Sequence, residues 1–404
     1  MKNILVDKMK ICMFAKGLPV HTAGGMEIHT WDLVNGLIKR GHEVTIITTK
    51  HPNGVKKEDG ENLTIYYIGD RPLYIKGKFQ KQALKLFVEL DKREHFDIVH
   101  SQSSAGISYA ELDNRAPLIV TRHGFHLGEV KSKLHEKNIK SFLIAIFMYL
   151  SSIRRKKRNK RLLNERVNKS IAVSYQIYED IRKHENTPED RMVAIPNGID
   201  VSRFKPMPVE ELRESLNSMD EKIIVSIGAI HKQKGFHLLL KVLPDILKYD
   251  NKVRLVIVGT GPYLDRLKMI ADKLNISESV VFAGRVSDDD LPGYYNLADV
   301  IVNPTMRLEG LPLVIPEAMA CEKPVIASAI GGIKDVIENG VSGTLVPPGD
   351  VDALKENIIR ILSDEQLAHE LGKNARKRVV DRFSLDRMVE DTLNVYESVL
   401  GGNK

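Results

Sequence analysis

Two glutamates stand within residues 303–320, whose sequence is NPTMRLEGLPLVIPEAMA. Glu309 lies beside Gly310 in an expected loop. Glu317 lies in the first turn of an expected helix, because Pro316 suits the first helical position and Glu-Ala-Met-Ala favours helix. The free N–H groups at such a helix start attract phosphate, and both carboxylates can face the same ligand. This arrangement predicts a phosphorylated, hydroxyl-rich ligand. Two nearby carboxyl groups also allow general acid/base chemistry. A plain helix N-terminus with a favourable glutamate is the simpler alternative.

Glycine, histidine and lysine residues also stand where expected strands end. Gly24 and Gly25 follow the first strand, where the lack of a side chain lets backbone N–H groups approach phosphate; a plain strand-to-helix turn is the alternative. His123 follows a later strand, where its imidazole can bond a sugar hydroxyl or can be an ordinary surface-loop histidine. Lys234 lies just before a helix, where its ammonium can neutralise a leaving diphosphate. All of them need a scaffold that gathers strand ends at one edge.

Short apolar segments rich in Val and Ile alternate with helical stretches along nearly the whole chain. Because these segments are apolar on both faces and joined by helices, they predict parallel sheets covered on both sides. The expected strands are 10–15, 44–48, 97–101, 117–121, 170–174 and 193–195 in a first series, and 222–228, 253–259, 279–283, 300–303, 324–327 and 343–346 in a second. A linker with Pro and Gly, 196–208, separates the series. The fold class is therefore expected to be α/β, with two doubly wound Rossmann-like domains facing across a ligand-binding cleft.

Length and composition agree with two ordinary globular domains. The 404 residues suffice for two cores, and 43% hydrophobic and 28% charged residues exclude a disordered or fibrous chain. The two cysteines, Cys12 and Cys321, provide neither a disulfide framework nor a metal-ligand spacing, so we expect a reducing compartment. The N-terminus lacks a signal-peptide pattern, and the longest apolar run, 142–150, is far shorter than the ~20 residues that span a bilayer. We expect a cytoplasmic protein.

Positive charge is concentrated in one segment. Residues 131–169 contain thirteen Lys or Arg against two Glu, a net of +11, whereas the whole chain carries +7. Within it, an all-apolar helix is followed by a polybasic cluster, 154–161, which is either a core helix with a solvated end or an interfacial segment. The second alternative predicts peripheral contact with an anionic membrane at its inner face through 131–169. Nucleic acid is not expected as a partner, because the cluster has no interleaved aromatic residues and the rest of the chain is acidic.

The motifs together resemble a known family. Glu309 and Glu317 have seven residues between them and are followed by AMA, KPVIA and a glycine pair; GGMEIH, KQKG, VGTGP and VFAGRV occur at other strand ends. In this combination the chain resembles the retaining family 4 glycosyltransferases (glycosyl transferases group 1), which are nucleotide-sugar enzymes of the GT-B fold. The resemblance covers nearly all of the 404 residues.

The resemblance implies that the two domains bind different substrates. Residues 1–198 would form an acceptor-side domain, onto which a C-terminal helix at about 385–404 packs back, and residues 199–384 would form the nucleotide-sugar donor domain. The implied activity is metal-independent, retaining transfer of a hexose-type sugar from a UDP- or GDP-linked donor, with no cofactor besides the donor. The acceptor, such as a lipid-linked or cell-surface glycan precursor, would contact the loops around 128–138.

The resemblance also implies a role for each candidate residue. Glu317 would hold the ribose hydroxyls and Glu309 the hydroxyls of the donor sugar, which His123 would also touch. Lys234, the backbone of the glycine pair and the Glu317 helix would stabilise the departing diphosphate. The expected catalytic residues are Lys234, Glu309 and His123, and the expected donor-binding residues are Gly24, Gly25, Gly228, Lys234, Gly259, Arg285, Val286, Glu309, Gly310, Leu311, Pro312, Leu313 and Glu317.

One position departs from the family pattern. Ala229 stands where the family has an Arg that shares the diphosphate charge with the lysine, so His231, Lys232 or Arg307 would have to substitute for it. This departure motivates an alternative, a catalytically weak nucleotide-sugar binding protein on the GT-B scaffold; another GT-B activity, such as epimerisation, is a further one. The acidic run 288–290 is expected to start a helix rather than to bind a metal ion, and the resemblance to GT-B enzymes implies no metal site.

Overall fold

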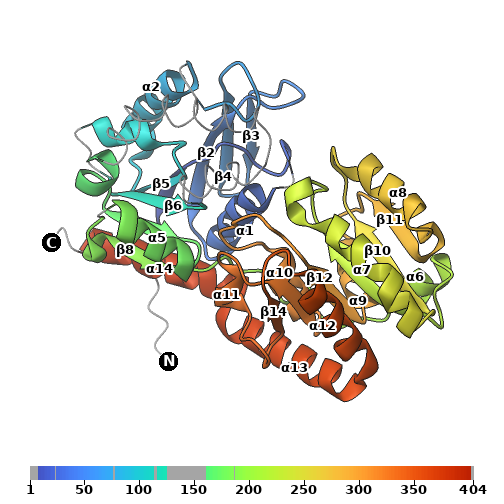
Figure 1. The fold of residues 1–404 in the computed structure, drawn as a ribbon. Helices are drawn as coiled ribbons and strands as arrows, with labels where there is room; N and C mark the ends of the chain where they lie inside the picture. Colours follow the sequence, from blue (N-terminus) through green and yellow to red (C-terminus); the bar gives the residue numbers. More distant parts are fainter. Residues whose placement is uncertain are drawn as a thin grey trace. The chain divides into compact units, whose positions relative to one another are not determined.

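A computed structural model of the chain describes residues 8–22, 24–75, 78–112, 116–124, 161–185 and 187–401. The chain divides into two compact units: unit 1 comprises Met1–Gly198 with Leu385–Lys404, and unit 2 comprises Ile199–Ser384. Each unit is an α/β structure built on its own sheet (Figure 1). The loops predicted around 128–138, the apolar helix and nearly all of the polybasic cluster lie outside the described residues.

Unit 1 contains an eight-stranded sheet in the order β3-β4-β2-β1-β5-β6-β7-β8. Every neighbouring pair is parallel except β3 and β4, which are antiparallel. The strands are β1 (Lys10–Phe14), β2 (Glu43–Thr49), β3 (Lys57–Gly60), β4 (Leu63–Ile68), β5 (Ile98–Gln102), β6 (Leu118–Arg122), β7 (Lys169–Ala172) and β8 (Met192–Ala194). Two of these, β3 and β4, were absent from the predicted strands. The four residues of β3 are all exposed, so the strand has no apolar pattern that would reveal it.

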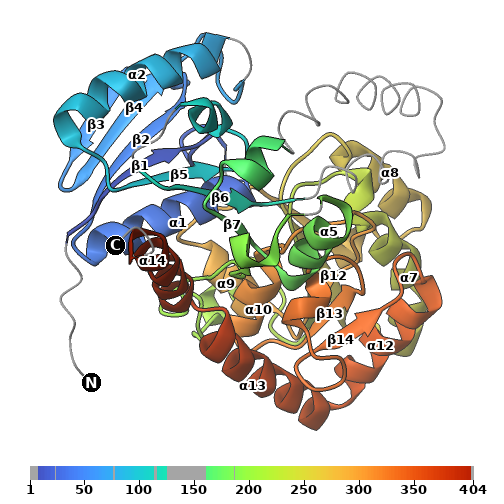
Figure 2. The ribbon, with the colours of Figure 1, turned by 90° about the vertical axis from the view of Figure 1, so that its left-hand side faces the viewer.

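Helices cover both faces of this sheet. This arrangement is required because successive side chains of β1 point to opposite faces and are buried on both. Ile11 and Met13 pack into the cluster that includes the helices α1 (Gly25–Lys39) and α14 (Leu385–Gly401), whereas Cys12 and Phe14 pack on the other face with α2 (Lys78–Glu94). The C-terminal helix α14 lies beside α1 (Figure 2). A Cβ on Gly36 would approach Val389 to 2.4 Å, so this glycine permits the close packing of the two helices. Further helices in the described part of the unit include η1 (Ile107–Glu111), α5 (Tyr175–Glu185) and η2 (Glu189–Arg191), and residues 161–165 are also helical.

Unit 2 contains a six-stranded, wholly parallel sheet in the order β11-β10-β9-β12-β13-β14. Its strands are β9 (Lys222–Ile227), β10 (Val253–Val258), β11 (Val280–Gly284), β12 (Val300–Asn303), β13 (Val325–Ser328) and β14 (Thr344–Val346). Its helices are α6 (Glu210–Ser215), η3 (Lys232–Lys234), α7 (Phe236–Tyr249), α8 (Leu264–Lys273), η4 (Ser277–Ser279), α9 (Leu291–Leu297), α10 (Val314–Ala320), α11 (Ile333–Val336), α12 (Val351–Ser363) and α13 (Glu365–Arg382). Every strand of this unit was predicted from the sequence to within one or two residues.

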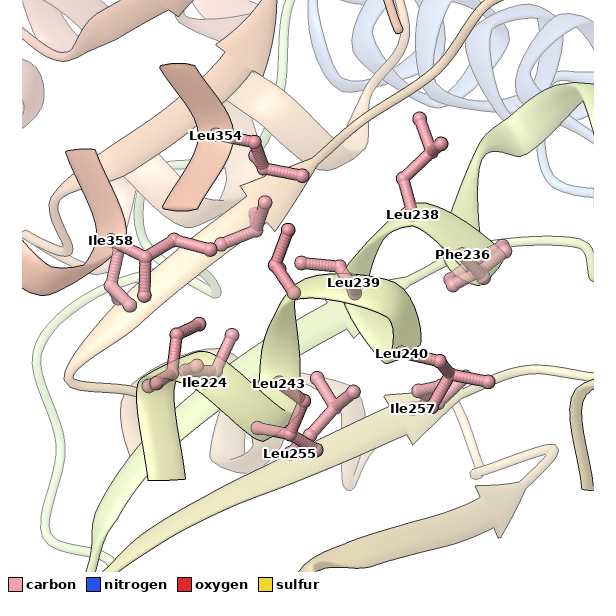
Figure 3. Packing of buried hydrophobic residues seen from close by; sticks show 14 of the residues in the cluster. Ile224, Phe236, Leu238, Leu239, Leu240, Leu243, Leu255, Ile257, Leu354 and Ile358 are labelled. Carbon is pink, nitrogen blue, oxygen red and sulfur yellow. The ribbon is translucent and has the colours of Figure 1, made fainter. Parts of the chain in front are cut away.

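Aliphatic side chains fill the space between this sheet and one helical layer. Leu239 and Leu243 of α7 and Ile358 of α12 meet Leu255 and Ile257 of β10 in one buried cluster (Figure 3). On the opposite face α9 packs against β9, and α10 packs against β13. Helices on both sides of a parallel sheet give the doubly wound architecture predicted from the sequence.

Helix α10 begins earlier than expected. It starts at Val314, so Pro316 is its third residue rather than its first. Ile315 and Glu317 donate their N–H groups to Pro312 and Leu313, and these bonds extend the first turn toward the loop. Proline is still tolerated there, because the first N–H groups of a helix have no intrahelical partner. Within the described part of the chain, no helix combines the length and the apolar character required to cross a bilayer.

Candidate functional site

In unit 2 the predicted residues stand on loops that leave neighbouring strands. Strand β12 lies between β9 and β13, and all three are parallel. Their carboxyl ends therefore share one edge of the sheet, where ligands bind in open α/β folds. Lys234 ends η3 after β9, Glu309 lies in the loop after β12, and Glu317 lies in α10.

Lys234 and Glu309 form a nearly symmetric ion pair. The Lys234 Nζ lies 2.8 Å from each carboxylate oxygen of Glu309. Thr305, which is fully buried, donates from Oγ1 to the Glu309 Oε1 at 3.1 Å, and its own oxygen accepts the Arg307 N–H at 3.2 Å. The side chains of Lys234 and Glu309 are 19% and 15% exposed, so the pair is mostly shielded from water but can be reached by a ligand.

Two close backbone contacts set the positions of these loops. Gly235 has φ of 79°, and a Cβ there would lie 1.9 Å from the Pro304 carbonyl oxygen. Gly331 has φ of 58°, and its Cβ would lie 2.2 Å from the Glu309 carbonyl oxygen, which accepts the Gly332 N–H at 3.1 Å. Any side chain would separate the loops. These glycines therefore let the segments that carry Lys234 and Glu309 pack directly against their neighbours.

Glu317 is held by a tyrosine from a different helix. Its side chain is 6% exposed, and its Oε2 accepts the hydroxyl hydrogen of Tyr295, in α9, at 2.5 Å. Burial and the neighbouring Glu317 raise the pKa of Tyr295 well above its usual value, so the phenol remains a hydrogen-bond donor. Tyr295 was not predicted as a site residue, because a tyrosine inside an amphipathic helix gives no signal beyond core packing.

The other donor-binding candidates lie in turns and loops of unit 2. Gly228 and Gly259 follow β9 and β10, and the Gly259 N–H donates to the Gly284 carbonyl at 2.7 Å. Arg285 and Val286 lie just beyond β11, the first exposed and the second partly buried. The remaining candidates form the segment between Glu309 and α10, of which Gly310 is partly buried and Leu311, Pro312 and Leu313 are buried.

The three candidates to replace the Arg missing at Ala229 are all exposed. His231 precedes η3, Lys232 opens it, and both are exposed, as is Arg307 on the Glu309 loop. Of these three, only Arg307 is tied to the ion pair, because its N–H donates to the Thr305 oxygen that also bonds Glu309. Its guanidinium forms no ion pair with any described residue.

In unit 1 the glycine pair starts α1. Gly24 is the N-cap residue and Gly25 the first helical residue, and neither has a positive φ. A Cβ on Gly24 would lie 2.4 Å from Oε2 of Glu27, which is 6% exposed. The Glu27 carboxylate therefore folds back to the positive end of its own helix, where the sequence had predicted space for phosphate.

His123, which is partly exposed, adjoins a buried group of histidines and neutral polar residues. Its Nε2 lies 2.7 Å from Oε1 of Gln102, the last residue of β5, and its ring meets that of His29 edge to face, with 4.7 Å between ring centroids. Beside them, His100 bonds the Tyr396 hydroxyl at 2.6 Å and Thr121 Oγ1 at 2.7 Å. Only His123 was predicted as a site residue; His29 was noted within the GGMEIH motif, and His100 is indistinguishable in the sequence from a core histidine.

All three histidines are neutral at physiological pH. Burial lowers the pKa of His29 to about 4, an effect that its interaction with Asn197 partly offsets, and burial lowers that of His100 to about 3. Burial also lowers the pKa of His123 well below its usual value, followed by repulsion from His29 and His100. The cluster can therefore exchange hydrogen bonds with hydroxyl groups but does not present a positive charge.

Among residues 8–401 as far as they are described, no group of three His, Cys, Asp or Glu side chains is arranged to hold a metal ion. The acidic run 288–290 lies before α9, where Ser287 Oγ accepts the Asp290 N–H at 3.1 Å. The only described part of the basic segment, 161–169, contains an exposed Arg161–Glu165 pair with 3.7 Å between Nε and Oε2.

The chain is a glycosyltransferase of the GT-B class, as its similarity to known proteins shows. The family model for Glycosyltransferase Family 4 matches residues 23–203, and that for Glycosyl transferases group 1 matches residues 208–378. An uncharacterized glycosyltransferase of Methanocaldococcus jannaschii is 30% identical over 96% of this chain and 98% of its own length. The chain therefore belongs to the family 4 glycosyltransferases.

Other similar proteins share either part of the sequence or the fold. A GDP-mannose-dependent alpha-(1-6)-phosphatidylinositol monomannoside mannosyltransferase of Mycolicibacterium smegmatis is 32% identical over 48% of this chain and 53% of its own. Sucrose-phosphate synthase from Thermosynechococcus elongatus is 25% identical, with a TM-score of 0.81 over 98% of this chain and 100% of its own. Anabaena HepE, solved with UDP and glucose, is 20% identical, with a TM-score of 0.73 over 96% of this chain and 100% of its own, and shows the same fold.

Gly331→Ala should destabilise unit 2 because the new Cβ would collide with the Glu309 carbonyl. The matched control is Gly349→Ala, which has a similar positive φ of 80° but open space around its Cβ. We expect Gly331→Ala to lose about 2 kcal/mol more unfolding free energy than the control, since overpacking typically costs 1–3 kcal/mol. Denaturant unfolding measures both variants. Equal losses would contradict the close approach of the two loops.

The histidine cluster makes stability depend on pH. Because the folded-state pKa of His29 is about 4, below the usual 6.5, the unfolded chain binds the proton first, and stability falls as pH drops from about 6.5 toward 4. Between pH 7 and pH 5, His29→Phe should remove about 2 kcal/mol of the pH-dependent loss of unfolding free energy. Replacement of the exposed His369 by Gln is the control and should leave the profile unchanged. Parallel profiles for wild type and His29→Phe would show that His29 titrates normally.

Proposed function

We propose that this glycosyltransferase moves a hexose-type sugar from a nucleoside-diphosphate donor to an acceptor with retention of configuration, without a metal ion or a further cofactor. The observation that carries this proposal is the contact between Lys234 and both carboxylate oxygens of Glu309. An ammonium and a carboxylate side by side at one sheet edge match the two parts of a sugar diphosphate. The cation suits the phosphates, and the carboxylate suits the sugar hydroxyls.

In the proposed reaction the bond between the sugar C1 and the diphosphate oxygen breaks, and a new bond forms between C1 and an acceptor oxygen on the same face. The acceptor proton passes to the departing phosphate. Glu309 is ill suited to attack C1, because Lys234 and Thr305 already engage its carboxylate. Rate enhancement would then come from positioning and from the positive charge of Lys234 on the leaving group.

Glu317 and His123 complete the proposed recognition of hydroxyl groups. Glu317 would accept hydrogen bonds from the ribose, with Tyr295 fixing the orientation of its carboxylate. His123 of unit 1 would bond a hydroxyl of the donor sugar, and the backbone of Gly24 and Gly25 would contact the diphosphate. The nearby Glu27 carboxylate weakens phosphate binding at that helix start, so we assign most of the diphosphate charge to unit 2.

The donor is proposed to carry UDP or GDP. GDP-mannose appears in the name of the mycobacterial relative, and UDP with glucose in the Anabaena structure. A lipid-linked or cell-surface glycan precursor is proposed as acceptor, and the basic segment 131–169 would place a cytoplasmic enzyme at an anionic membrane surface. That segment lies almost wholly outside the described residues, so its membrane contact stays a prediction.

A nucleotide-sugar binding protein with weak catalysis is the second candidate. The observation that favours it is Ala229, which leaves Lys234 as the one cation held beside Glu309 among the described residues. Product analysis separates the two candidates: transfer yields a glycosylated acceptor, whereas binding alone leaves the donor intact. Epimerisation would instead change the donor sugar without an acceptor.

Nucleotide binding should depend on Glu317. A ligand that binds only the folded state stabilises it by about 2.7 kcal/mol at a hundredfold excess over its Kd. We expect UDP or GDP, and not ADP, to raise the Tm of the wild type selectively, and Glu317→Ala to abolish this rise. Tyr295→Phe keeps the carboxylate but removes its buried bond and should weaken binding about fivefold. No response to any nucleotide would contradict the donor site.

Lys234→Ala should mainly lower turnover. A charge that acts on the leaving group is worth about a hundredfold in kcat, whereas the ground-state donor affinity changes less. Lys241→Ala, at an exposed position of the following helix α7, is the control and should retain full activity. Steady-state kinetics with the identified donor measure both. An unchanged kcat with a raised KM would assign Lys234 to ground-state binding only.

A further inference from the structure

Gln102 is fully buried at the carboxyl end of β5, and both ends of its amide are engaged. Its Oε1 lies 2.7 Å from Nε2 of His123, and its Nε2 donates to the sulfur of the buried Met13 at 3.8 Å. A thioether sulfur accepts hydrogen bonds but donates none, so the amide nitrogen belongs on the Met13 side. The carbonyl oxygen must then face His123.

The orientation of the Gln102 amide determines where His123 carries its proton. A neutral imidazole has one N–H and one acceptor nitrogen. Because Oε1 of Gln102 can only accept, Nε2 of His123 must donate, and its Nδ1 is left as the acceptor. No described residue forms a hydrogen bond with Nδ1, and the side chain is partly exposed at the end of β6.

We propose that Gln102 is a positioning residue that holds His123 in the Nε2–H form, so that Nδ1 accepts a hydrogen bond from a substrate hydroxyl. This inference rests on the proposed function for the identity of the substrate. It assigns a direction to the contact: the sugar hydroxyl donates and the imidazole accepts. An imidazolium, or the opposite tautomer, could not accept there.

The surroundings of His123 support a neutral ring. The titratable groups that face it among the described residues are His29 of α1 and His100 of β5, which are themselves neutral near pH 7. The neighbouring Arg122 is engaged elsewhere, because its guanidinium bonds both carboxylate oxygens of Glu185 at 2.9 Å. No described carboxylate forms an ion pair with His123, so nothing at the ring favours its protonated form.

The tautomer can be measured without substrate. In protein labelled with ¹⁵N-histidine, long-range ¹H–¹⁵N spectra at pH 7.5 should show His123 with a protonated Nε2 and a bare Nδ1. Gln102→Leu removes the acceptor and should redistribute the proton toward Nδ1. Thr121→Val deletes a comparable buried bond, to His100, without touching His123, and should leave the His123 pattern unchanged. A protonated Nδ1 in the wild type, or an unchanged pattern in Gln102→Leu, would overturn the proposal.

Kinetics test the consequence for the reaction. Gln102→Leu should lower kcat at least about tenfold, since a wrong tautomer removes the correctly oriented lone pair. Nucleotide binding should be unaffected, because the nucleotide is assigned to unit 2. Gln102→Glu keeps an acceptor for Nε2 but favours imidazolium, so its activity should recover as pH rises from 7 to 9, a change that a purely structural role would not produce.

The two hypotheses fail in different ways. If the chain binds no nucleotide and transfers no sugar, the proposed function fails while the tautomer assignment can still hold. If nucleotide binding and transfer are intact but Gln102→Leu has wild-type kcat, the positioning role of Gln102 fails and the proposed function stands. Thermal unfolding of each variant identifies any loss of activity that comes from loss of folded protein.

Discussion

The backbone of Glu309 is fixed by the loop that follows β13. Its carbonyl accepts the Gly332 N–H, and Gly331 passes so close that no side chain fits between them. The same kind of contact joins Gly235 to Pro304. Because these are contacts between main chains, they set loop spacing more rigidly than side-chain packing could. These two backbone contacts determine the distance from Lys234 to Glu309. The charge distribution of unit 2 depends on that distance.

Stability alone does not explain the ion pair on that edge. Shielding an ammonium and a carboxylate from water costs several kcal/mol per ion, and well-packed apolar residues of the same volume are often equally or more stable. Lys234 and Glu309 nevertheless remain mostly buried, with Thr305 bonding the carboxylate. An incoming diphosphate and sugar would compete for the same two groups. The pair therefore keeps an ammonium and a carboxylate neutralised by each other at this edge of the sheet.

The sequence predicted most of the scaffold, because strands that are buried on both faces are continuous apolar runs. It missed β3, an edge strand whose four exposed residues carry no apolar pattern, and it overlooked β4, whose sequence LTIYYI does have the residue types of a strand. It placed Glu309 and Lys234 in separate loops but could not show their contact, since that depends on which strands are neighbours. The sequence could not identify Thr305, Tyr295 and Gln102 as site residues, because their roles follow only from the hydrogen bonds that they form in the folded protein.

The two units differ in the charge of their polar groups at the strand ends. Unit 2 places a lysine and glutamates at the strand ends, and these suit a phosphorylated ligand. Unit 1 removes charge from its histidines by burial and connects them to Gln102, Thr121 and Tyr396 through neutral hydrogen bonds. A neutral imidazole neither attracts stray anions nor adds positive charge to this hydrogen-bond network of unit 1. Burial of His29 and His100, with His123 partly exposed beside them, is the physical cause of the low pKa values of this cluster, and it leaves neutral hydrogen bonding as the cluster's means of contacting a polar group.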